Sequence, residues 1–386
     1  MTIKYLDELG KEDLEGKRVL LRLDLNVSVV EGKVFDDFDI QKIIPTVDFL
    51  RNKNAQTIIL AHIEDNHGEP TTLLPVLDYL KGYFTVDFCP TYFTPEAVDK
   101  VLKLENKGVL LFENVRINPG EKENDSEFAK KLSQMADIYV NDAFGVSHRK
   151  HASIVGVPEF LPHYGGLLMR QEIKRLSKVF NATNSSLHPF VFILGGAKFD
   201  TKLPLIKKYL QIADWVFVGG ALANDIFKAK GFEVGTSLVS EGEFNLASII
   251  QDPKLKLPVD VTVTKVNEKV GFKNPEGVLK DECIVDAGPK TVEQIKSLLS
   301  GVKTVVWNGP LGNYELGFKD RTEMLSKIIV KATTAGTESV VGGGDTIASI
   351  SKLGLKHKFS FISTGGGAML DFLLDETLVG IQSLEK

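Results

Sequence analysis

The sequence predicts an α/β fold made of parallel sheets flanked by helices and divided into two domains. Short apolar, β-branched runs alternate with longer amphipathic stretches along the chain, as in repeated βα units. The length of 386 residues allows two domains of ordinary size. A polar, turn-rich stretch at 181–189 marks the end of a connection between them, so the domain boundary is expected between about Pro162 and Pro189.

Nine apolar runs have the composition of buried parallel strands, because both faces of such strands are covered and few polar residues interrupt them. They are 18–25, 57–61, 108–111, 138–140, 190–194, 215–218, 304–307, 339–341 and 359–362.

Segments between these runs place apolar residues three and four positions apart, which is the pattern of helices with one buried face. The stretches 125–135 and 203–212 have this spacing. The stretch 170–180 has it as well, and its place before the polar connection predicts a helix that links the two domains.

Composition and charge exclude several classes of protein. The formal net charge is −5 and no Lys/Arg-rich tract with interleaved aromatic residues occurs, which argues against nucleic acid as a partner. Cys89 and Cys283 are too few and too far apart for a disulfide framework or a zinc site, so we expect a reducing cytoplasm. No signal peptide and no membrane span are expected, because no apolar stretch approaches the ~18 residues that a span requires.

Three predicted strands in the second half end in glycine, at 193–202, 341–347 and 362–370. Glycine lets backbone N–H groups approach an anion closely, and a following helix directs its positive end at the same point, so phosphate is the expected ligand. None of the three has a Walker sequence. For a single glycine-rich turn, tight packing of the strand against the helix is the alternative to a phosphate site. Three turns at the carboxyl ends of parallel strands favour a ligand site.

Charged residues accompany two of these turns. Lys198 and Lys202 begin a predicted helix four positions apart and could face one phosphate chain, although a solvated helix face is the alternative. Asp345 suits a magnesium ligand, since Mg²⁺ prefers carboxylate and phosphate oxygens, but the same residue could cap a helix.

The motifs together resemble the phosphoglycerate kinase family along essentially the whole chain. The similar segments, in family order, are 18–27, 113–116, 136–145, 148–153, 195–198, 306–310, 342–346 and 363–368.

The resemblance implies a monomeric enzyme with two Rossmann-like lobes joined by a hinge helix. Residues 1–169 would bind 3-phosphoglycerate or 1,3-bisphosphoglycerate, residues 170–188 would form the hinge helix and linker, and residues 189–370 would bind Mg²⁺ with ADP or ATP. The tail from about residue 371 would return to the first lobe. The implied reaction is reversible phosphoryl transfer between ATP and the carboxyl group of 3-phosphoglycerate, in glycolysis.

The resemblance also assigns roles residue by residue. Lys198, Lys202, Gly366 and Gly367 would be catalytic, beside Gly365 in the same turn. Asp345 would be the metal ligand. The nucleotide would contact Gly195, Lys198, Lys202, Gly220, Asn308, Pro310, Glu315, Gly343, Gly344, Asp345 and Thr346. The acid substrate would contact Asp24, Asn26, His62, Arg116 and Arg149, within a basic group that includes Arg22, His148 and His151.

The sequence departs from the family at the acid site. Asp39 stands where the family has an arginine that meets the transferring phosphoryl group, and Glu64 and Asp65 replace a Gly-Arg pair whose arginine holds the substrate phosphate. An arginine that stabilises a phosphoryl-transfer transition state is worth roughly 10³–10⁵ in rate. Smaller departures in the nucleotide half are Asn313 near the sugar, and Phe199 and Asp200 between the two lysines.

These departures leave three functions open. The chain could be a working phosphoglycerate kinase if other cations replace the arginines, for which Lys33, Lys42, His67 and Lys150 are candidates. It could phosphorylate a different, less anionic acceptor. It could also be a nucleotide-responsive binding protein without turnover. The first function is preferred because all five acid-site residues assigned above remain in the sequence.

Overall fold

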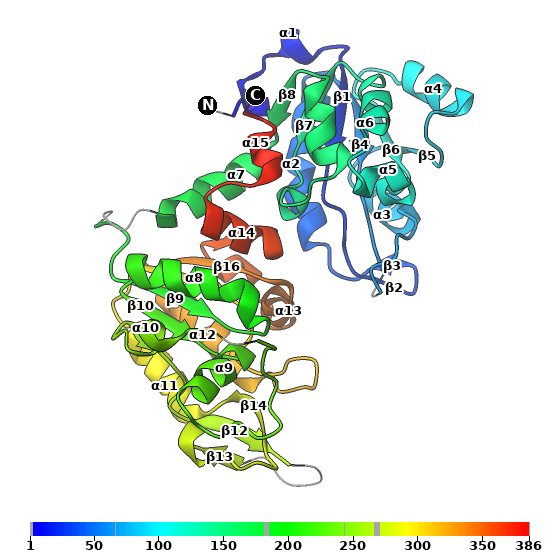
Figure 1. The fold of residues 1–386 in the computed structure, drawn as a ribbon. Coiled ribbons are helices and arrows are strands. Elements are labelled where there is room, and N and C mark those ends of the chain that lie inside the picture. Colours follow the sequence, from blue (N-terminus) through cyan, green and yellow to red (C-terminus); the bar gives the residue numbers. More distant parts are fainter. Residues whose placement is uncertain (1–2, 66, 181–184, 243, 266–270, 386) are drawn as a thin grey trace. The chain divides into compact units, whose positions relative to one another are not determined.

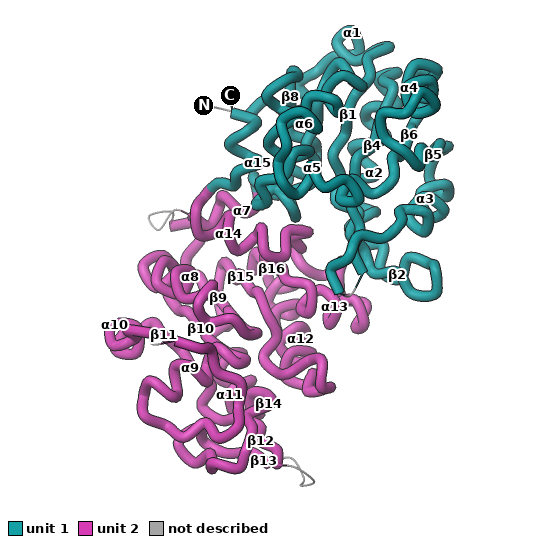
Figure 2. The backbone as a smooth tube through the Cα atoms, turned by 45° about the vertical axis from the view of Figure 1, so that its right-hand side comes forward, with its two compact units in different colours: residues 1–174, 377–386 teal, residues 175–376 magenta. Residues whose placement is uncertain are grey.

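The fold comes from a computed structural model that describes residues 3–65, 67–180, 185–242, 244–265 and 271–385. The chain forms two compact units, Met1–Lys174 with Thr377–Lys386, and Arg175–Glu376 (Figure 2). The change from the first unit to the second falls inside helix α7, Leu167–Leu176. Part of the predicted connection, residues 181–184, lies outside the described residues.

Unit 1 contains a six-stranded sheet in the order β5-β6-β4-β1-β7-β8, in which every pair is parallel. A separate two-stranded ribbon is formed by β2 and β3. The strands are β1 (Arg18–Arg22), β2 (Val29–Val30), β3 (Lys33–Val34), β4 (Gln56–Leu60), β5 (Asp87–Cys89), β6 (Val109–Phe112), β7 (Ile138–Asn141) and β8 (His163–Gly165).

The helices of unit 1 cover both faces of this sheet (Figure 1). They are α1 (Lys11–Leu14), α2 (Phe38–Asn52), α3 (Leu74–Leu80), α4 (Pro95–Leu102), α5 (Pro119–Lys122), α6 (Ser126–Ser133), the start of α7, and α15 (Val379–Gln382).

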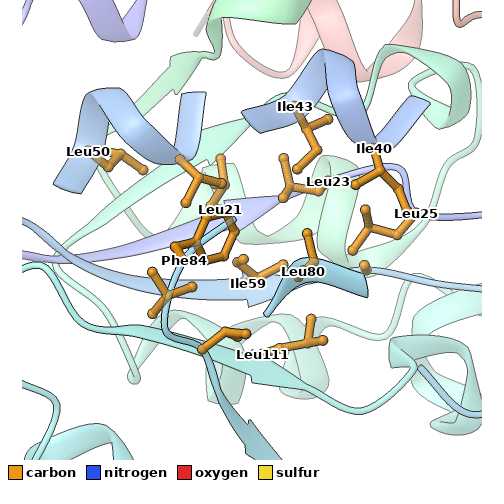
Figure 3. Packing of buried hydrophobic residues seen from close by; sticks show 14 of the residues in the cluster. Leu21, Leu23, Leu25, Ile40, Ile43, Leu50, Ile59, Leu80, Phe84 and Leu111 are labelled. Carbon is orange, nitrogen blue, oxygen red and sulfur yellow. The ribbon is translucent and has the colours of Figure 1, made fainter. Parts of the chain in front are cut away.

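Alternating side chains of β1 explain the two cores. Leu21 belongs to a cluster with Ile43 of α2 and Leu80 of α3, as Figure 3 shows. Leu20 points to the other face, into a cluster with Val101 of α4 and Leu132 of α6. Because successive strand residues face opposite sides, the continuous apolar runs in the sequence give a sheet buried on both faces.

Unit 2 contains a second six-stranded parallel sheet, in the order β11-β10-β9-β15-β16-β17, and a three-stranded antiparallel sheet, β13-β12-β14. The strands are β9 (Phe190–Leu194), β10 (Trp215–Val218), β11 (Leu255–Lys256), β12 (Val261–Thr264), β13 (Gly271–Lys273), β14 (Cys283–Ala287), β15 (Thr304–Asn308), β16 (Glu338–Gly342) and β17 (Phe361–Ile362).

Helices pack around the parallel sheet of unit 2. Helix α8 contacts β10 and α14, whereas α12 and α13 contact β16, and α11 packs on α12. The helices are α8 (Phe199–Ile212), α9 (Ala221–Ala229), α10 (Ala247–Ile250), α11 (Pro289–Leu298), α12 (Asp320–Thr334), α13 (Gly344–Lys352) and α14 (Gly367–Asp375). Within the described ranges of the chain, no helix combines the length and apolar character needed to span a membrane.

The predicted fold class, two parallel sheets flanked by helices, is confirmed. The first predicted strand, 18–25, is too long, because β1 ends at Arg22 and the chain then leaves the ladder. The antiparallel sheet of unit 2 was not predicted. Its core contains Val261 and Val263, which pack against Phe227 of α9.

The C-terminal residues Thr377–Lys386 are part of unit 1. The backbone N–H of Gly380 donates to Ser147 O at 2.8 Å, and Leu384 belongs to the core cluster that contains Leu20. The segment from residue 371 to Glu376, which the resemblance assigned to the tail, completes α14 and remains in unit 2, where α14 packs on α8.

Removing residues 377–386 is expected to destabilise unit 1 by about 3–6 kcal/mol, since Leu378, Ile381 and Leu384 are almost fully buried. A urea unfolding experiment measures this. Gly380→Ala tests the same packing with a smaller expected loss of stability, because the added Cβ would lie 2.8 Å from Ile154 Cγ2. Gly277→Ala, where a Cβ would meet nothing within 4 Å, is the matched control. Unchanged stability of the shortened chain would contradict this packing.

Candidate functional site

Both parallel sheets have a topological switch point, where successive connections leave to opposite sides of the first strand. In unit 2 this point lies between β9 and β15, and in unit 1 it lies between β1 and β7. Ligands of open α/β sheets bind in the crevice at the carboxyl ends of the strands beside such a point. Most candidate residues of both units follow these strands or their direct neighbours. Arg116 follows β6, and Gly366 and Gly367 follow β17, one strand farther from the switch point in each sheet.

The loops after β9 and β15 pack backbone against backbone at the switch point of unit 2. Gly195 N donates to Asn308 O and Gly196 N donates to Pro310 O, both at 2.8 Å. A Cβ on Gly195 would lie 2.2 Å from Pro310 O, so only glycine fits there. Gly309, with a φ of +92°, donates its N–H to Thr346 Oγ1 at 3.0 Å and thereby connects the loop that follows β16.

Four helices of unit 2 begin directly after strands of the parallel sheet. Gly220 precedes α9, Gly343 precedes α13 and Gly366 precedes α14, all with positive φ, while Lys198 precedes α8 in the left-handed region at φ 64°. Gly344 and Gly367 begin α13 and α14, and a Cβ at either position would meet nothing within 4 Å. Packing therefore does not require these two glycines, and their backbone is open to a ligand.

Lys202 is the central cation of this loop group. Its Nζ donates to Gly195 O at 2.8 Å and would lie 3.1 Å from a Cβ on Gly196. Burial lowers the pKa of Lys202 to about 8, with Asp345 acting in the opposite direction and Lys198 reinforcing the decrease. Lys198, Lys202 and Asp345 are therefore close enough to influence one another. Among the residues that the structure describes, no carboxylate forms an ion pair with this partly buried ammonium group, which therefore suits a phosphate oxygen.

A cavity of about 220 Å³ adjoins these loops in unit 2. Gly220, Pro310, Glu315 and Asp345, all predicted nucleotide contacts, line it, as does Asn313. The other predicted contacts lie in the adjoining loops, strand end and first helical turns rather than in the wall of the cavity, namely Gly195, Lys198, Lys202, Asn308, Gly343, Gly344 and Thr346. Gly366 and Gly367 follow β17, at the edge of the sheet, and do not line this cavity.

The two departures between the lysines have a structural explanation. The ring of Phe199 is fully buried and packs edge-on against Phe244 at 5.2 Å between centroids, and its N–H donates to Ser240 Oγ. Asp200 is exposed in the first turn of α8, where a negative charge favours the helix dipole.

The donor set fits Mg²⁺ carried by a nucleotide better than an ion held by protein alone. In the part of the chain that the structure describes, no group of three or more His, Cys, Asp or Glu residues could hold a metal ion. Asp345 supplies a single carboxylate in the first turn of α13. Magnesium is bound through one or two carboxylates with the remaining ligands from phosphate and water, so Asp345 suits this role.

Arg22 anchors the candidate acid site of unit 1. Its side chain is fully buried, and Nε donates to Ser153 Oγ at 2.8 Å. Ser153 Oγ in turn donates to a carboxylate oxygen of Glu121 at 2.6 Å. Arg22 also lies 3.3 Å from Nδ1 of His62, whose pKa is held well below its usual range by burial and then by Arg22 and Arg116. His62 is therefore neutral at physiological pH.

Positive charges converge on His151 at the same edge of the sheet. Burial lowers the pKa of His151 to about 4, and Arg116, Arg22, Arg149 and Lys122 all act in the same direction. Asp24 and Asn26 lie just beyond β1, where Asp24 Oδ1 is 3.8 Å from His62 Nδ1. The structure thus brings together the residues of unit 1 that the resemblance assigned to the acid, namely Asp24, Asn26, His62, Arg116 and Arg149, with Arg22 and His151 beside them.

Glu64 contacts this basic group directly. Its carboxylate lies 2.7 Å from Arg116 and 3.2 Å from Lys122, and its N–H donates to Asn26 Oδ1 at 2.9 Å. Burial by itself would raise the pKa of Glu64, but Arg116 and Lys122 lower it below the usual value. The cation that joins Arg116 is Lys122, which the sequence pattern did not indicate.

Asp39 and Asp65 have local structural roles. Asp39 lies in the first turn of α2, where an acidic side chain is favourable to the helix dipole. One carboxylate oxygen of Asp65 accepts the N–H groups of His67 and Glu69, at 2.8 and 2.9 Å, and these bonds lower the pKa of Asp65. The Asp65 carboxylate is exposed and shapes its own loop.

Several cavity residues of unit 2 were missed by sequence reasoning. Asp286, at the end of β14, lines the cavity with Asn224 of α9, and burial raises the pKa of Asp286 to about 7. The sequence carried a weak local signal for Asn224, because it follows the paired glycines 219–220, as other candidate loops follow glycine. For Asp286 no signal was recognised, since β14 belongs to the sheet that was not predicted.

The fold and these two groups of residues define a two-unit α/β protein with glycine-rich and charged loops at the carboxyl edges of parallel sheets. Comparisons with known proteins lead to the same class of protein. The sequence model of the family "Phosphoglycerate kinase" matches residues 8–376. The chain belongs to the phosphoglycerate kinase family.

Its similarity to individual members extends over nearly the full length of both chains. It is 41% identical to the phosphoglycerate kinase of Pseudothermotoga lettingae, over 100% of this chain and 98% of the relative, and 40% identical to that of Fervidobacterium nodosum, over 96% of each. The solved phosphoglycerate kinase of Pyrococcus horikoshii superposes with a TM-score of 0.85 at 30% identity, covering 99% of this chain and 98% of that one. That of Coxiella burnetii gives 0.80 at 33%, with 100% and 98% covered.

Proposed function

We propose that the chain is a phosphotransferase of the phosphoglycerate kinase type, which transfers a phosphoryl group reversibly between ATP and the carboxyl group of 3-phosphoglycerate. The observation that carries this proposal is the loop group of unit 2, where the partly buried Lys202 donates to Gly195 O and lies close enough to Asp345 and Lys198 for their charges to affect its pKa. Family membership supports the same reaction. We further propose that it acts as a cytoplasmic monomer in glycolysis, with small molecules as its partners.

In this proposal, unit 2 binds the nucleotide. The ammonium groups of Lys198 and Lys202 and the first N–H groups of α13 and α14 would neutralise phosphate charge, and Asp345 would hold Mg²⁺, which supplies further charge neutralisation when bound. Gly366 and Gly367 would contact the transferred group. Phosphoryl transfer depends mainly on positioning and charge stabilisation, so these donors are the catalytic contribution of unit 2.

Unit 1 would bind the acid through Arg116 and Arg149, with His62, Asp24 and Asn26 around them. Guanidinium groups match the oxygens of phosphate and carboxylate in pairs, which suits a ligand that carries both. His62 and His151 are neutral near pH 7, so the arginines and Lys122 provide the positive charge of this site.

A second candidate function has one observation in its favour. Glu64 already neutralises Arg116 and Lys122, and this arrangement favours an acceptor with less negative charge than 3-phosphoglycerate. The kinase chemistry of unit 2 would be the same in that case.

A coupled assay of ATP-dependent phosphorylation of 3-phosphoglycerate tests the proposal. We expect product formation that requires Mg²⁺ and is lost in Asp345→Asn. Consumption of ATP with a different acceptor, but not with 3-phosphoglycerate, would support the second candidate. No transfer to any acceptor, together with intact nucleotide binding, would contradict both and indicate a binding protein.

A further inference from the structure

The carboxylate of Glu64 takes the place that an anionic ligand would occupy at Arg116. Its oxygens lie 2.7 Å from a terminal nitrogen of Arg116 and 3.2 Å from Nζ of Lys122. The Arg116 side chain is only 7% exposed, so its charge is largely removed from water and would be costly to leave without an anionic partner. Glu64 itself is 19% exposed, which leaves its carboxylate within reach of solvent.

The surrounding segment holds Glu64 in this position. Its N–H donates to Asn26 Oδ1, and Glu64 pairs with Pro70 in an isolated antiparallel bridge. Between these two residues, Asp65 O accepts the N–H of Gly68, and the Asp65 carboxylate accepts two more backbone N–H groups. The loop is therefore organised by its own hydrogen bonds, and the Glu64 carboxylate is left to face the cations.

The basic group also retains donors that Glu64 does not satisfy. Nε of Arg116 is buried and has no hydrogen-bond partner among the residues that the structure describes. Arg149 is exposed near His151. An acid that entered this group would bond to these donors, but it would compete with Glu64 for the terminal nitrogens of Arg116 and for Lys122.

We propose that Glu64 is an internal competitor of the acid ligand, which determines how strongly the Arg116–Lys122 pair binds an anion. The proposal rests on the proposed function in one respect, that unit 1 is the acid-binding unit. Each anion that binds the terminal nitrogen of Arg116 and Lys122 must displace a carboxylate of the same charge sign. Glu64 therefore weakens binding of highly charged anions most, and it is a specificity-determining residue.

Glu64→Gln tests this proposal, because it keeps the size of the side chain and removes its charge. We expect the variant to bind 3-phosphoglycerate about 10- to 100-fold more tightly in calorimetric titrations, as follows from the usual strength of a hydrogen bond between charged groups. Glu64→Gln should also bind inorganic sulfate, a simple anion without a carbon skeleton, more tightly than the unmodified protein does. The matched control is Asp65→Asn, which removes the neighbouring negative charge. Because the Asp65 carboxylate accepts loop N–H groups and does not contact Arg116, we expect the anion affinities of this variant to change by less than about threefold.

Further measurements separate competition from a merely structural role. If Glu64 had only a structural role, Glu64→Gln would lower the Tm and leave the affinities for 3-phosphoglycerate and sulfate unchanged. That result would overturn the proposal. The double variant Glu64→Gln, Arg116→Gln should lose the gain, and a gain that persists without Arg116 would also overturn it. Tighter binding of sulfate with no binding of 3-phosphoglycerate by any variant would support the competition by Glu64 and contradict the proposed acceptor.

Discussion

Lys202→Met is expected to weaken binding of Mg-ADP about 10²- to 10³-fold while making the free protein more stable. The loss of affinity follows from removing a partly buried ammonium group from the predicted phosphate site. The gain in stability follows from removing a charge that burial penalises, and we expect about 1–2 kcal/mol at pH 7 after the lost bond to Gly195 is included. Higher stability together with lost affinity is the result expected when a functional site holds a charge at a cost in stability, so the two measurements together identify such a site.

The pH dependence of this gain has a definite sign. The pKa of Lys202 is lowered to about 8 in the folded protein, below the ordinary value of 10.5, so the unfolded chain binds more protons between these values. Stability of the unmodified protein therefore rises with pH from about 8 to 10.5 through this group. The advantage of Lys202→Met is full below pH 8 and disappears over the same window.

Two controls isolate the role of Lys202. Lys202→Arg keeps the charge and should retain more affinity than the methionine variant. Lys207→Met changes an exposed lysine on the same helix and should alter neither nucleotide affinity nor stability by more than about 0.5 kcal/mol. Equal affinity of Lys202→Met and the unmodified protein for Mg-ADP would contradict the assignment.

The double variant Asp39→Arg, Asp65→Arg is expected to raise kcat/KM for 3-phosphoglycerate by about 10²- to 10³-fold. Arginines at these positions would restore the pattern of the family, and one arginine at a transferring phosphoryl group is worth roughly 10³–10⁵ in rate. We expect an effect at or below the lower end of that range, because Glu64 still neutralises Arg116 in the variant.

Each half of this double variant has its own structural effect. An arginine at position 39 places a positive charge in the first turn of α2, an unfavourable change of about 0.3–1 kcal/mol. An arginine at position 65 cannot accept the N–H groups of His67 and Glu69. Asp39→Asn with Asp65→Asn is the matched control, since it removes both acids without adding cations. Turnover of the arginine variant at or below that of the unmodified protein would show that these acids do not limit the reaction.

Much of the fold and part of the candidate site could be predicted because their signals are local. The run before Gly195 is apolar at every position, as a strand buried on both faces must be, and β9 has the predicted bounds. Gly195, which follows it, is required because a Cβ there would lie 2.2 Å from Pro310 O, and such a requirement leaves a mark in the sequence.

Other features could not be predicted because they depend on segments far apart in the chain. The ion pair between Glu64 and Arg116 joins loops after β4 and β6, which only the sheet order brings together. The antiparallel sheet of unit 2 depends on pairing between β12 and β14, and Val261–Thr264 alone is too short to indicate it. The end of β1 at Arg22 was missed because Leu23 and Leu25 are buried beyond the ladder, so hydrophobicity continues where the strand does not.

The central claim is that the loops of unit 2 around Lys202 bind the phosphate chain of a nucleotide. A calorimetric titration of the unmodified protein with Mg-ADP, repeated with Lys202→Met, tests it most directly. We predict one saturable site in the unmodified protein and binding at least about 100-fold weaker in the variant. No saturable heat with the unmodified protein, or equal binding by both, would contradict the claim.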